Sequence, residues 1–476
     1  MTCLGRLRTG VAALMLVAAP LGASAESLSD ALIMAYRNSG LLENNRATLR
    51  AADEDVAQAV AALRPVITYT AQMARQYAFP NDRTTGETSI GGLTIAGRRI
   101  TDTEETVASM SLAADLLLWD GGAARLAIDS AKELVLVARQ GLIAVEQIVL
   151  LNAVDAFVSV REAEALVNLR QNNVRLIDQQ LQAAQDRFEV GEVTRTDVAL
   201  AESRLASGRS DLAAALGNLE IARAEYREQI GQLPGNLTPP GNLPQTAPSL
   251  DAAQAVAVRT HPDIQRDQRL VTVAELSIAR AKAQMKPRIS AQARVAIDEN
   301  YEENASVGIV MTGPIYRGGQ LTSLYRQAIA QRDANRGDLY ETINDIERQV
   351  ATAWARLEVA RARISATDLE IRAATVAFEG LQEEAQLGAR TTLDVLDAEQ
   401  DLLNARVDAI QARTTEVLAV YAVLAAMGLL TVDHLNLGIV TYDPSAYYDA
   451  VSDAPIHRIS PQGAKLDALL RSLGRE

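Results

Sequence analysis

The chain has 476 residues, of which 4% are aromatic, and its formal net charge at pH 7 is −14. A protein this acidic is a poor candidate for nucleic acid binding. The shortage of bulky aromatic side chains argues against a large globular core and favours extended helices that pack closely.

Residues 1–25 predict a secretory signal peptide. Its basic start contains Arg6 and Arg8, and an apolar stretch follows at residues 11–22. It ends in a small-residue cleavage site, Ala23-Ser24-Ala25. The only cysteine of the chain, Cys3, lies in this segment. We therefore expect an exported mature chain that has neither a disulfide nor a thiolate metal site.

The rest of the sequence contains one unit twice. The matching blocks are residues 26–72 with 248–294 and residues 118–231 with 315–428. The chain therefore divides into repeat 1 (residues 26–231), a proline-rich linker (232–248), repeat 2 (249–428) and a C-terminal segment (429–476). The C-terminal segment has no counterpart, and we expect a small mixed structure with a partly disordered tail.

Each repeat is predicted to contain two β-strands, at about 66–79 and 107–119 in repeat 1 and at 288–298 and 305–316 in repeat 2. A polar loop, residues 80–105, separates the strands of repeat 1. In the third strand Ile289, Ala291 and Ala293 alternate with Ser290, Gln292 and Arg294, the period of a strand with one apolar face. The alternation fits a membrane strand and an ordinary half-buried sheet equally well.

Beyond the signal peptide, the longest uninterrupted apolar run, residues 418–430, is too short for a membrane helix. Any membrane-spanning part is therefore expected to consist of the strands. Four strands cannot close a barrel, which needs about eight, and open sheet edges are not tolerated in lipid. If the strands cross a membrane, several chains must share one barrel.

Long helical hairpins are predicted to follow the strands. Residues 120–191 contain no proline and would span ~100 Å as one helix. The partner stretch has a seven-residue apolar repeat, which indicates a left-handed supercoil, at Val198, Leu205, Leu212, Leu219 and Tyr226. A generic coiled coil would show the same period but would not explain the inserted strands.

A short turn occurs once in each repeat and is predicted to form the tip of each hairpin, at residues 190–194 and 387–391. Gly191 and Gly388 can adopt φ > 0 where one helix ends, and a threonine three residues later can cap the next helix. Asp197 and Asp394 then stand at the spacing of a capping box, with Asp in place of Glu.

The sequence contains no motif for a phosphate loop, a nucleophile elbow, a dinucleotide site or a His-Glu-x-x-His metal site. Its histidines, His261, His434 and His457, are far apart, and His261 before Pro262 is expected to begin a helix. We therefore predict no catalytic, cofactor-binding or metal-binding residues, and we do not expect an enzyme.

The doubled unit resembles the TolC family of outer-membrane efflux and secretion channels. The motifs that carry the resemblance are His261-Pro262-Asp263-Ile264, Leu118-Trp119-Asp120-Gly121-Gly122, Pro314-Ile315-Tyr316-Arg317-Gly318-Gly319 and residues 388–397. The resemblance implies a mainly α, internally duplicated chain with four transmembrane strands. Three chains would form a twelve-stranded outer-membrane β-barrel that a periplasmic α-barrel continues.

The resemblance also implies partners. They are a periplasmic adaptor (membrane fusion) protein, an inner-membrane transporter of the RND, ABC or MFS class, and outer-membrane lipid. The duct would serve drug efflux or type I secretion. The alternative that we keep is an exported periplasmic coiled-coil or adhesion scaffold without channel activity.

The same resemblance implies roles for residues at the tips. Asp394 and Asp397 would form an acidic ring at the periplasmic entrance, and Arg390, Thr196 and Asp197 would form links between tips. Ala385 stands where the family has a tyrosine, so one closing link is missing or replaced. The residues expected to meet the adaptor are Val190, Gly191, Glu192, Val193, Leu387, Gly388 and Ala389.

Overall fold

The structure is a computed structural model that describes residues 26–78, 88–90, 93–95, 103–456, 464–465 and 468. The predicted signal peptide, most of the loop 80–105 and most of the tail after residue 456 lie outside these residues. The described chain is mostly helical with a small antiparallel sheet, which confirms the predicted fold class. It comprises two compact units, and both contain residues from both repeats.

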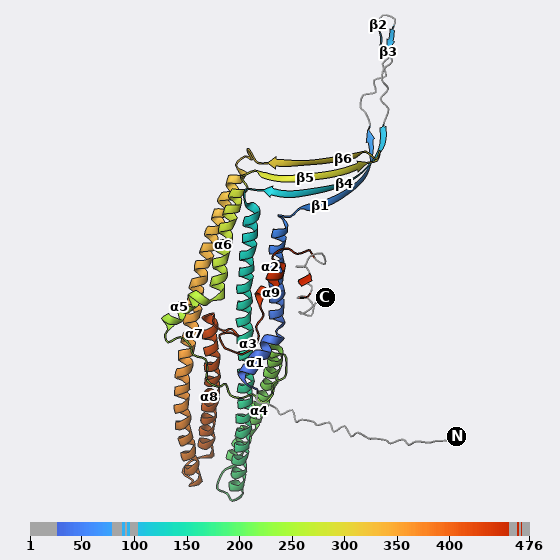
Figure 1. Ribbon diagram of the computed structural model, residues 1–476. Helices are drawn as coiled ribbons and strands as arrows, with labels where there is room; N and C mark the ends of the chain where they lie inside the picture. Colours follow the sequence, from blue (N-terminus) through green and yellow to red (C-terminus); the bar gives the residue numbers. More distant parts are fainter. Residues whose placement is uncertain are drawn as a thin grey trace, which may run out of the picture. The chain divides into compact units, whose positions relative to one another are not determined.

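Unit 1 contains only helices among its described elements. Its segments are Met1–Ser39, Val149–Thr246 and Trp354–Val423. They hold α1 (Leu28–Asn38), α4 (Arg195–Ile230), most of α8 (Thr392–Ala426) and the C-terminal parts of α3 (Ala123–Glu189) and α7 (Gln320–Gln386). The pair α3 and α4 is called hairpin 1, and the pair α7 and α8 is called hairpin 2. Within unit 1 the two hairpins lie side by side (Figure 1).

Small residues line the helix seams of unit 1. On α4, Ala201, Gly208 and Ala222 are buried and are spaced by multiples of seven residues, so small side chains recur where two backbones approach closely. A Cβ at Gly208 would lie 3.4 Å from Ile177 of α3, an ordinary van der Waals distance, so α3 and α4 pack closely at this position. At the far end of α4, Gly231 (φ 92°) ends the helix in the left-handed conformation that glycine permits.

Unit 2 holds the sheet, in the order β1-β4-β5-β6. The strands, all paired antiparallel, are β1 (Val66–Ala78), β4 (Thr103–Trp119), β5 (Arg288–Asp298) and β6 (Glu303–Thr312). β6 ends at Thr312, earlier than predicted, because Gly313 and Pro314 follow and proline lacks the N–H that a ladder requires. A short ribbon of β2 (Thr88–Ile90) and β3 (Leu93–Ile95) lies in the segment expected to be a loop.

The strand register sorts the side chains of this sheet into two faces. One cross-strand row is Tyr69, Leu112, Val295 and Ala305, and the next is Ile67, Ala114, Ala293 and Val307. A row on the opposite face is Thr70, Ser111, Ala296 and Asn304. The sheet thus has one apolar face, and Val307 on it is 88% exposed.

Helices below the sheet complete unit 2. They are α2 (Gly40–Ala61), α5 (Leu250–Thr260), α6 (Pro262–Ala283), α9 (Pro444–Val451) and the N-terminal parts of α3 and α7. His261 caps α6, because its Nδ1 accepts a hydrogen bond from the Asp263 N–H at 3.2 Å. The C-terminal segment docks on α2, where Tyr447 donates to Glu54 at 2.7 Å.

The helix α3 contains an 18-residue window with a mean hydropathy of 1.8, sufficient in length and composition to cross a membrane. A sequence-based search for uninterrupted apolar runs does not find this window, because the window can contain up to two charged residues. Only 22% of the window is buried within the chain. Core helices of soluble proteins pass the same test, so the window alone assigns no membrane span.

Candidate functional site at the hairpin tips

The two predicted tips have the same local construction. In hairpin 1, Gly191 (φ 80°) follows α3, and the Glu192 N–H donates to the Arg187 carbonyl at 2.9 Å. In hairpin 2, Gly388 (φ 76°) follows α7, and the Ala389 N–H donates to the Glu384 carbonyl at 2.9 Å. Both turns therefore satisfy the last helix carbonyls through a left-handed glycine.

Each tip restarts its helix with a capping box. The carboxylate of Asp197 accepts from the Thr194 N–H at 2.8 Å and from its hydroxyl at 2.7 Å. Asp394 accepts from Thr391 in the same way, at 2.9 and 2.8 Å. These bonds favour the ionised form and hold the pKa of both carboxyls below the usual value for aspartate.

Arg390 lies on the exposed turn of hairpin 2 and pairs within it: its Nε donates to Glu384 at 2.8 Å. Thr196 is exposed on the first turn of α4. Inside one chain, then, the structure gives Arg390 a partner on its own hairpin. Links from Arg390 to Thr196 and Asp197 of another chain stay a prediction.

Asp397 is the predicted gate residue that joins the two hairpins. Arg204 of α4 donates to its Oδ1 at 2.6 Å, and both side chains are substantially exposed. An exposed pair of this kind contributes at most about 1 kcal/mol to stability. The effect of the pair on charge is more important, because Arg204 partly neutralises a carboxylate that the family resemblance places in an acidic ring.

Glu399 is a residue that sequence reasoning missed. It is 4% exposed, and its Oε1 accepts a hydrogen bond from Nδ2 of Asn173 on α3 at 2.9 Å. Its Oε2 is buried without a hydrogen-bond partner among the described residues. Burial raises the pKa of Glu399 to about 7, although Asn173 and Arg204 oppose the shift. The sequence signal was available: Glu399 lies in the apolar stripe of α8, four residues after Val395 and three before Leu402.

An apolar cluster lies along the same stretch of α8, and we call it the tip cluster. Its buried members are Phe378 of α7 and Val395, Ala398 and Leu402 of α8. Leu176 of α3 packs against them, and so does Ala385, the residue at the family's tyrosine position. Ala385 thus contributes packing and no polar bond to the junction of the hairpins.

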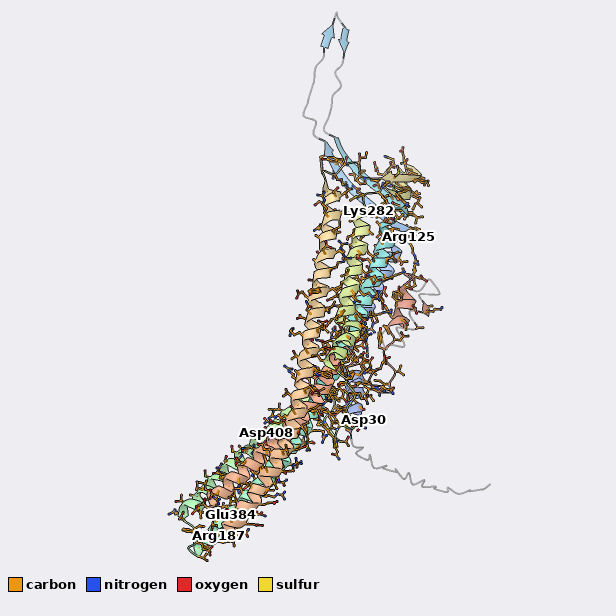
Figure 2. The ribbon with its side chains drawn as sticks, turned by 90° about the vertical axis from the view of Figure 1, so that its left-hand side faces the viewer. Asp30, Arg125, Arg187, Lys282, Glu384 and Asp408 are labelled. Carbon is orange, nitrogen blue, oxygen red and sulfur yellow. The ribbon has the colours of Figure 1, made fainter. Side chains whose placement is uncertain are left out.

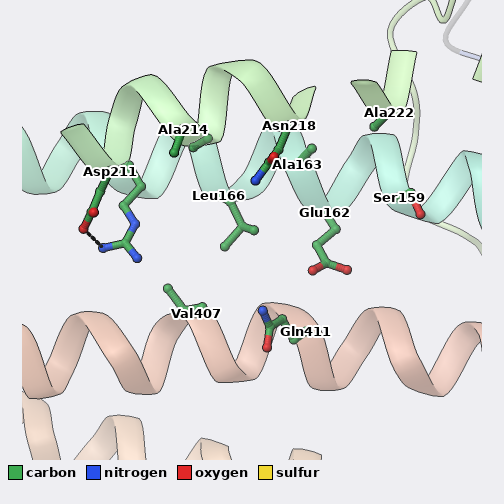
Figure 3. A pocket seen from close by; sticks show the side chains of 12 residues that line it. Ser159, Glu162, Ala163, Leu166, Asp211, Ala214, Asn218, Ala222, Val407 and Gln411 are labelled. Carbon is green, nitrogen blue, oxygen red and sulfur yellow. Dashed lines mark ion pairs between the residues drawn. The ribbon is translucent and has the colours of Figure 1, made fainter. Parts of the chain in front are cut away.

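A cavity of about 420 Å³ lies between α3, α4 and α8, farther from the tips (Figure 3). Glu162 and Leu166 of α3 face Val407 and Gln411 of α8 across it. Arg170 and Asp211, which line the same cavity, form an ion pair at 3.3 Å. Across the described residues, no three His, Cys, Asp or Glu side chains cluster as metal ligands.

The tip turns themselves are exposed. Val190 is 72% exposed and Leu387 is 86% exposed, so each tip presents a large apolar side chain to solvent. Figure 2 places Arg187 of hairpin 1 and Glu384 of hairpin 2 at the same end of unit 1. The residues predicted for adaptor docking therefore gather at one end of this unit.

The chain is similar to known outer membrane efflux proteins over almost its whole length. The family model described as outer membrane efflux protein matches residues 32–232 and 255–429. The outer membrane efflux protein BepC of Brucella suis biovar 1 is 32% identical over 467 residues, covering 96% of this chain and 95% of BepC. The alkaline protease secretion protein AprF of Pseudomonas aeruginosa is 24% identical and covers 54% of this chain and 57% of AprF.

A solved structure with the same fold is the CmeC outer membrane channel of Campylobacter jejuni. The TM-score is 0.71, with 16% sequence identity over 90% of each chain. At this identity the likeness describes the fold alone.

Proposed function

This chain belongs to the outer membrane efflux protein family, and from that premise we propose that three copies form one exit duct. The duct crosses the outer membrane as a twelve-stranded barrel, and the helices continue it into the periplasm. An inner-membrane transporter and a periplasmic adaptor open it. The chain conducts cargo and carries out no chemical reaction.

The observation that carries this proposal is the sheet of unit 2. Within the described chain, β1 and β6 are its edges, and each pairs with a single neighbour. An unsatisfied backbone group in lipid costs several kcal/mol, so an apolar sheet with open edges cannot stand alone in a membrane. Pairing β6 of one chain with β1 of the next removes every edge, and three chains supply twelve strands, within the observed range for barrels.

The two faces of the sheet support the same arrangement. Side chains such as Tyr69, Leu112 and Val307 would face lipid, and Thr70, Ser111 and Asn304 would face a water-filled interior. A soluble scaffold would instead expose this apolar face to water.

We propose that the tips form the periplasmic gate. Three copies each of Asp394 and Asp397 place six carboxylates near the axis, which favours cations over anions. Arg390, Thr196 and Asp197 hold neighbouring tips together. The turns 190–193 and 387–389 receive the adaptor, since each exposes a large apolar side chain beside a polar turn.

The relatives' names concern both efflux and protease secretion. A duct of this kind adds little selectivity beyond charge. We propose that the RND, ABC or MFS transporter that docks with it chooses the cargo.

The function is tested with the mature protein purified from outer membranes and reconstituted in planar bilayers. We expect trimers that dissociate on heating and a small, cation-selective conductance. Alanine at both Asp394 and Asp397 should reduce cation preference and block by multivalent cations, and Arg390→Ala should raise conductance. Recovery as a soluble periplasmic monomer would contradict the duct and favour the scaffold.

A further inference from the structure

The structure shows which bonds hold hairpin 2 against hairpin 1 next to the tips. Asp197, Asp394 and Arg390 all bond within their own hairpins, and Ala385 has no polar group to offer. Among the described residues, the polar side-chain contacts that bridge the hairpins at the start of α8 are Asn173 with Glu399 and Arg204 with Asp397.

We propose that Glu399 and Asn173 form the intrachain closing link of the gate, in place of a link at Ala385, and that Arg204 secures Asp397 beside it. The proposal rests on the duct function proposed above. Glu399 is a positioning residue here: it fixes the first turns of α8, which carry both predicted gate carboxylates.

The burial of this pair distinguishes it from an ordinary surface contact. Asn173 is 8% exposed and Glu399 is 4% exposed, and the tip cluster covers the same stretch of α8. A hydrogen bond inside a site of low polarity is stronger than one in water, and a buried polar group left without its partner is unfavourable. Separation of the hairpins is therefore opposed until both side chains reach water.

The internal duplication supplies a natural comparison. Glu202 of α4 occupies the position of repeat 1 that corresponds to Glu399, yet it is exposed. Glu370 stands where repeat 1 has Asn173, and it too is exposed. The same residue type is thus buried and bonded in one repeat and solvated in the other, so the link is not a general property of the repeat.

The charges around Glu399 set how the link responds to pH. The cation that acts on it is Arg204 of α4, which Asp397 of α8 already engages. On α3, the neighbour of Glu399 is the uncharged Asn173. Arg170 lies one turn away from Asn173 on the same helix, but it is paired with Asp211. From α7 the tip cluster contributes the apolar Phe378.

Docked hairpins therefore favour a protonated Glu399, whose pKa is about 7 against an ordinary value of 4.5. When the hairpins separate, the carboxyl regains its ordinary pKa. Between pH 7 and pH 4.5, the association of the two hairpins therefore strengthens as pH falls. The ratio of docked to separated hairpins rises by up to about tenfold per pH unit. Above pH 7 this contribution has been lost.

The test is the open probability of the reconstituted trimer from pH 8 to pH 5. The wild type should close progressively as pH falls below 7. Glu399→Gln mimics the protonated side chain, so it should stay closed at pH 8 and lose most of the pH dependence. Glu399→Ala and Asn173→Ala should raise open probability several-fold at pH 5. The matched control, Glu202→Gln, should follow the wild type.

A pH profile unchanged by Glu399→Gln, or equally altered by Glu202→Gln, would overturn the link. Amide hydrogen exchange of residues 392–402 provides a measurement that does not depend on conduction. Glu399→Ala should increase exchange there, and Glu202→Ala should not. If wild-type trimers fail to conduct at any pH while this exchange difference is seen, the duct function fails and the link stands.

Discussion

At the residue scale, burial decides the chemistry of individual side chains. Glu399 and Glu202 occupy corresponding positions of the two repeats, but only Glu399 is buried. Burial likewise lowers the pKa of His261, which accepts a backbone hydrogen bond at the start of α6. A neutral imidazole suits that role, because a protonated one has no lone pair for the N–H.

Asp53 of α2 is a further buried carboxyl. It is 0% exposed, and neither oxygen has a hydrogen-bond partner among the described residues. Burial raises its pKa to about 6, against the opposing charge of Arg139. A carboxyl whose pKa is raised on folding contributes stability at low pH that is lost as pH rises through its folded pKa.

We therefore expect Asp53→Asn to stabilise the protein at pH 8 more than at pH 5. The measurement is the heat stability of the detergent-solubilised protein at both pH values. Asp55→Asn is the control, because Asp55 is exposed on the same helix. An equal shift in both variants would show that net charge, not burial, is responsible.

At the element scale, the helices end at glycines that share one conformation but differ in surroundings. Gly388 (φ 76°) has open space around it, and an added Cβ would meet nothing within 4 Å. At Gly428 (φ 74°) the added Cβ would lie 2.6 Å from Cα of His261. Gly388 is therefore needed only for the left-handed turn, whereas Gly428 also allows its backbone to contact the backbone of His261.

Gly388→Ala should therefore destabilise the protein by about 1 kcal/mol, the cost of a left-handed alanine. Gly428→Ala should cost several times more, since the His261 backbone must also move. Thermal unfolding followed by circular dichroism would compare them. Similar shifts for the two variants would contradict the close contact at Gly428.

At the scale of the whole molecule, the apolar face and open edges of the sheet make a single chain incomplete. Val307 lies at the middle of the edge strand β6, on the apolar face. Gly308 is its neighbour on the opposite face, next to Gln292, and has space for a side chain.

Val307→Lys should impair membrane insertion, because a lysine facing lipid near the bilayer centre costs about 2–4 kcal/mol. Gly308→Lys places the same charge at the same depth on the interior face and should be tolerated. The measurement for both variants is the fraction of the protein recovered from the outer membrane as heat-modifiable trimer. Equal loss in the two variants would remove the assignment of faces.

The sequence by itself determined the features that are local or periodic. The duplication predicts two hairpins, the heptads predict their seams, and alternation predicts four strands. Gly191, Gly388 and the Thr–Asp spacing mark both tips, because a left-handed turn and a capping box need only neighbouring residues.

Only the tertiary structure decided which side chains meet across long separations. It joined the two repeats by pairing β4 with β5, paired Arg204 with Asp397, and buried Glu399 against Asn173. Each of these contacts joins residues far apart in sequence. Burial depends on the neighbours that packing supplies, and for that reason identical residues in the two repeats have different chemistry.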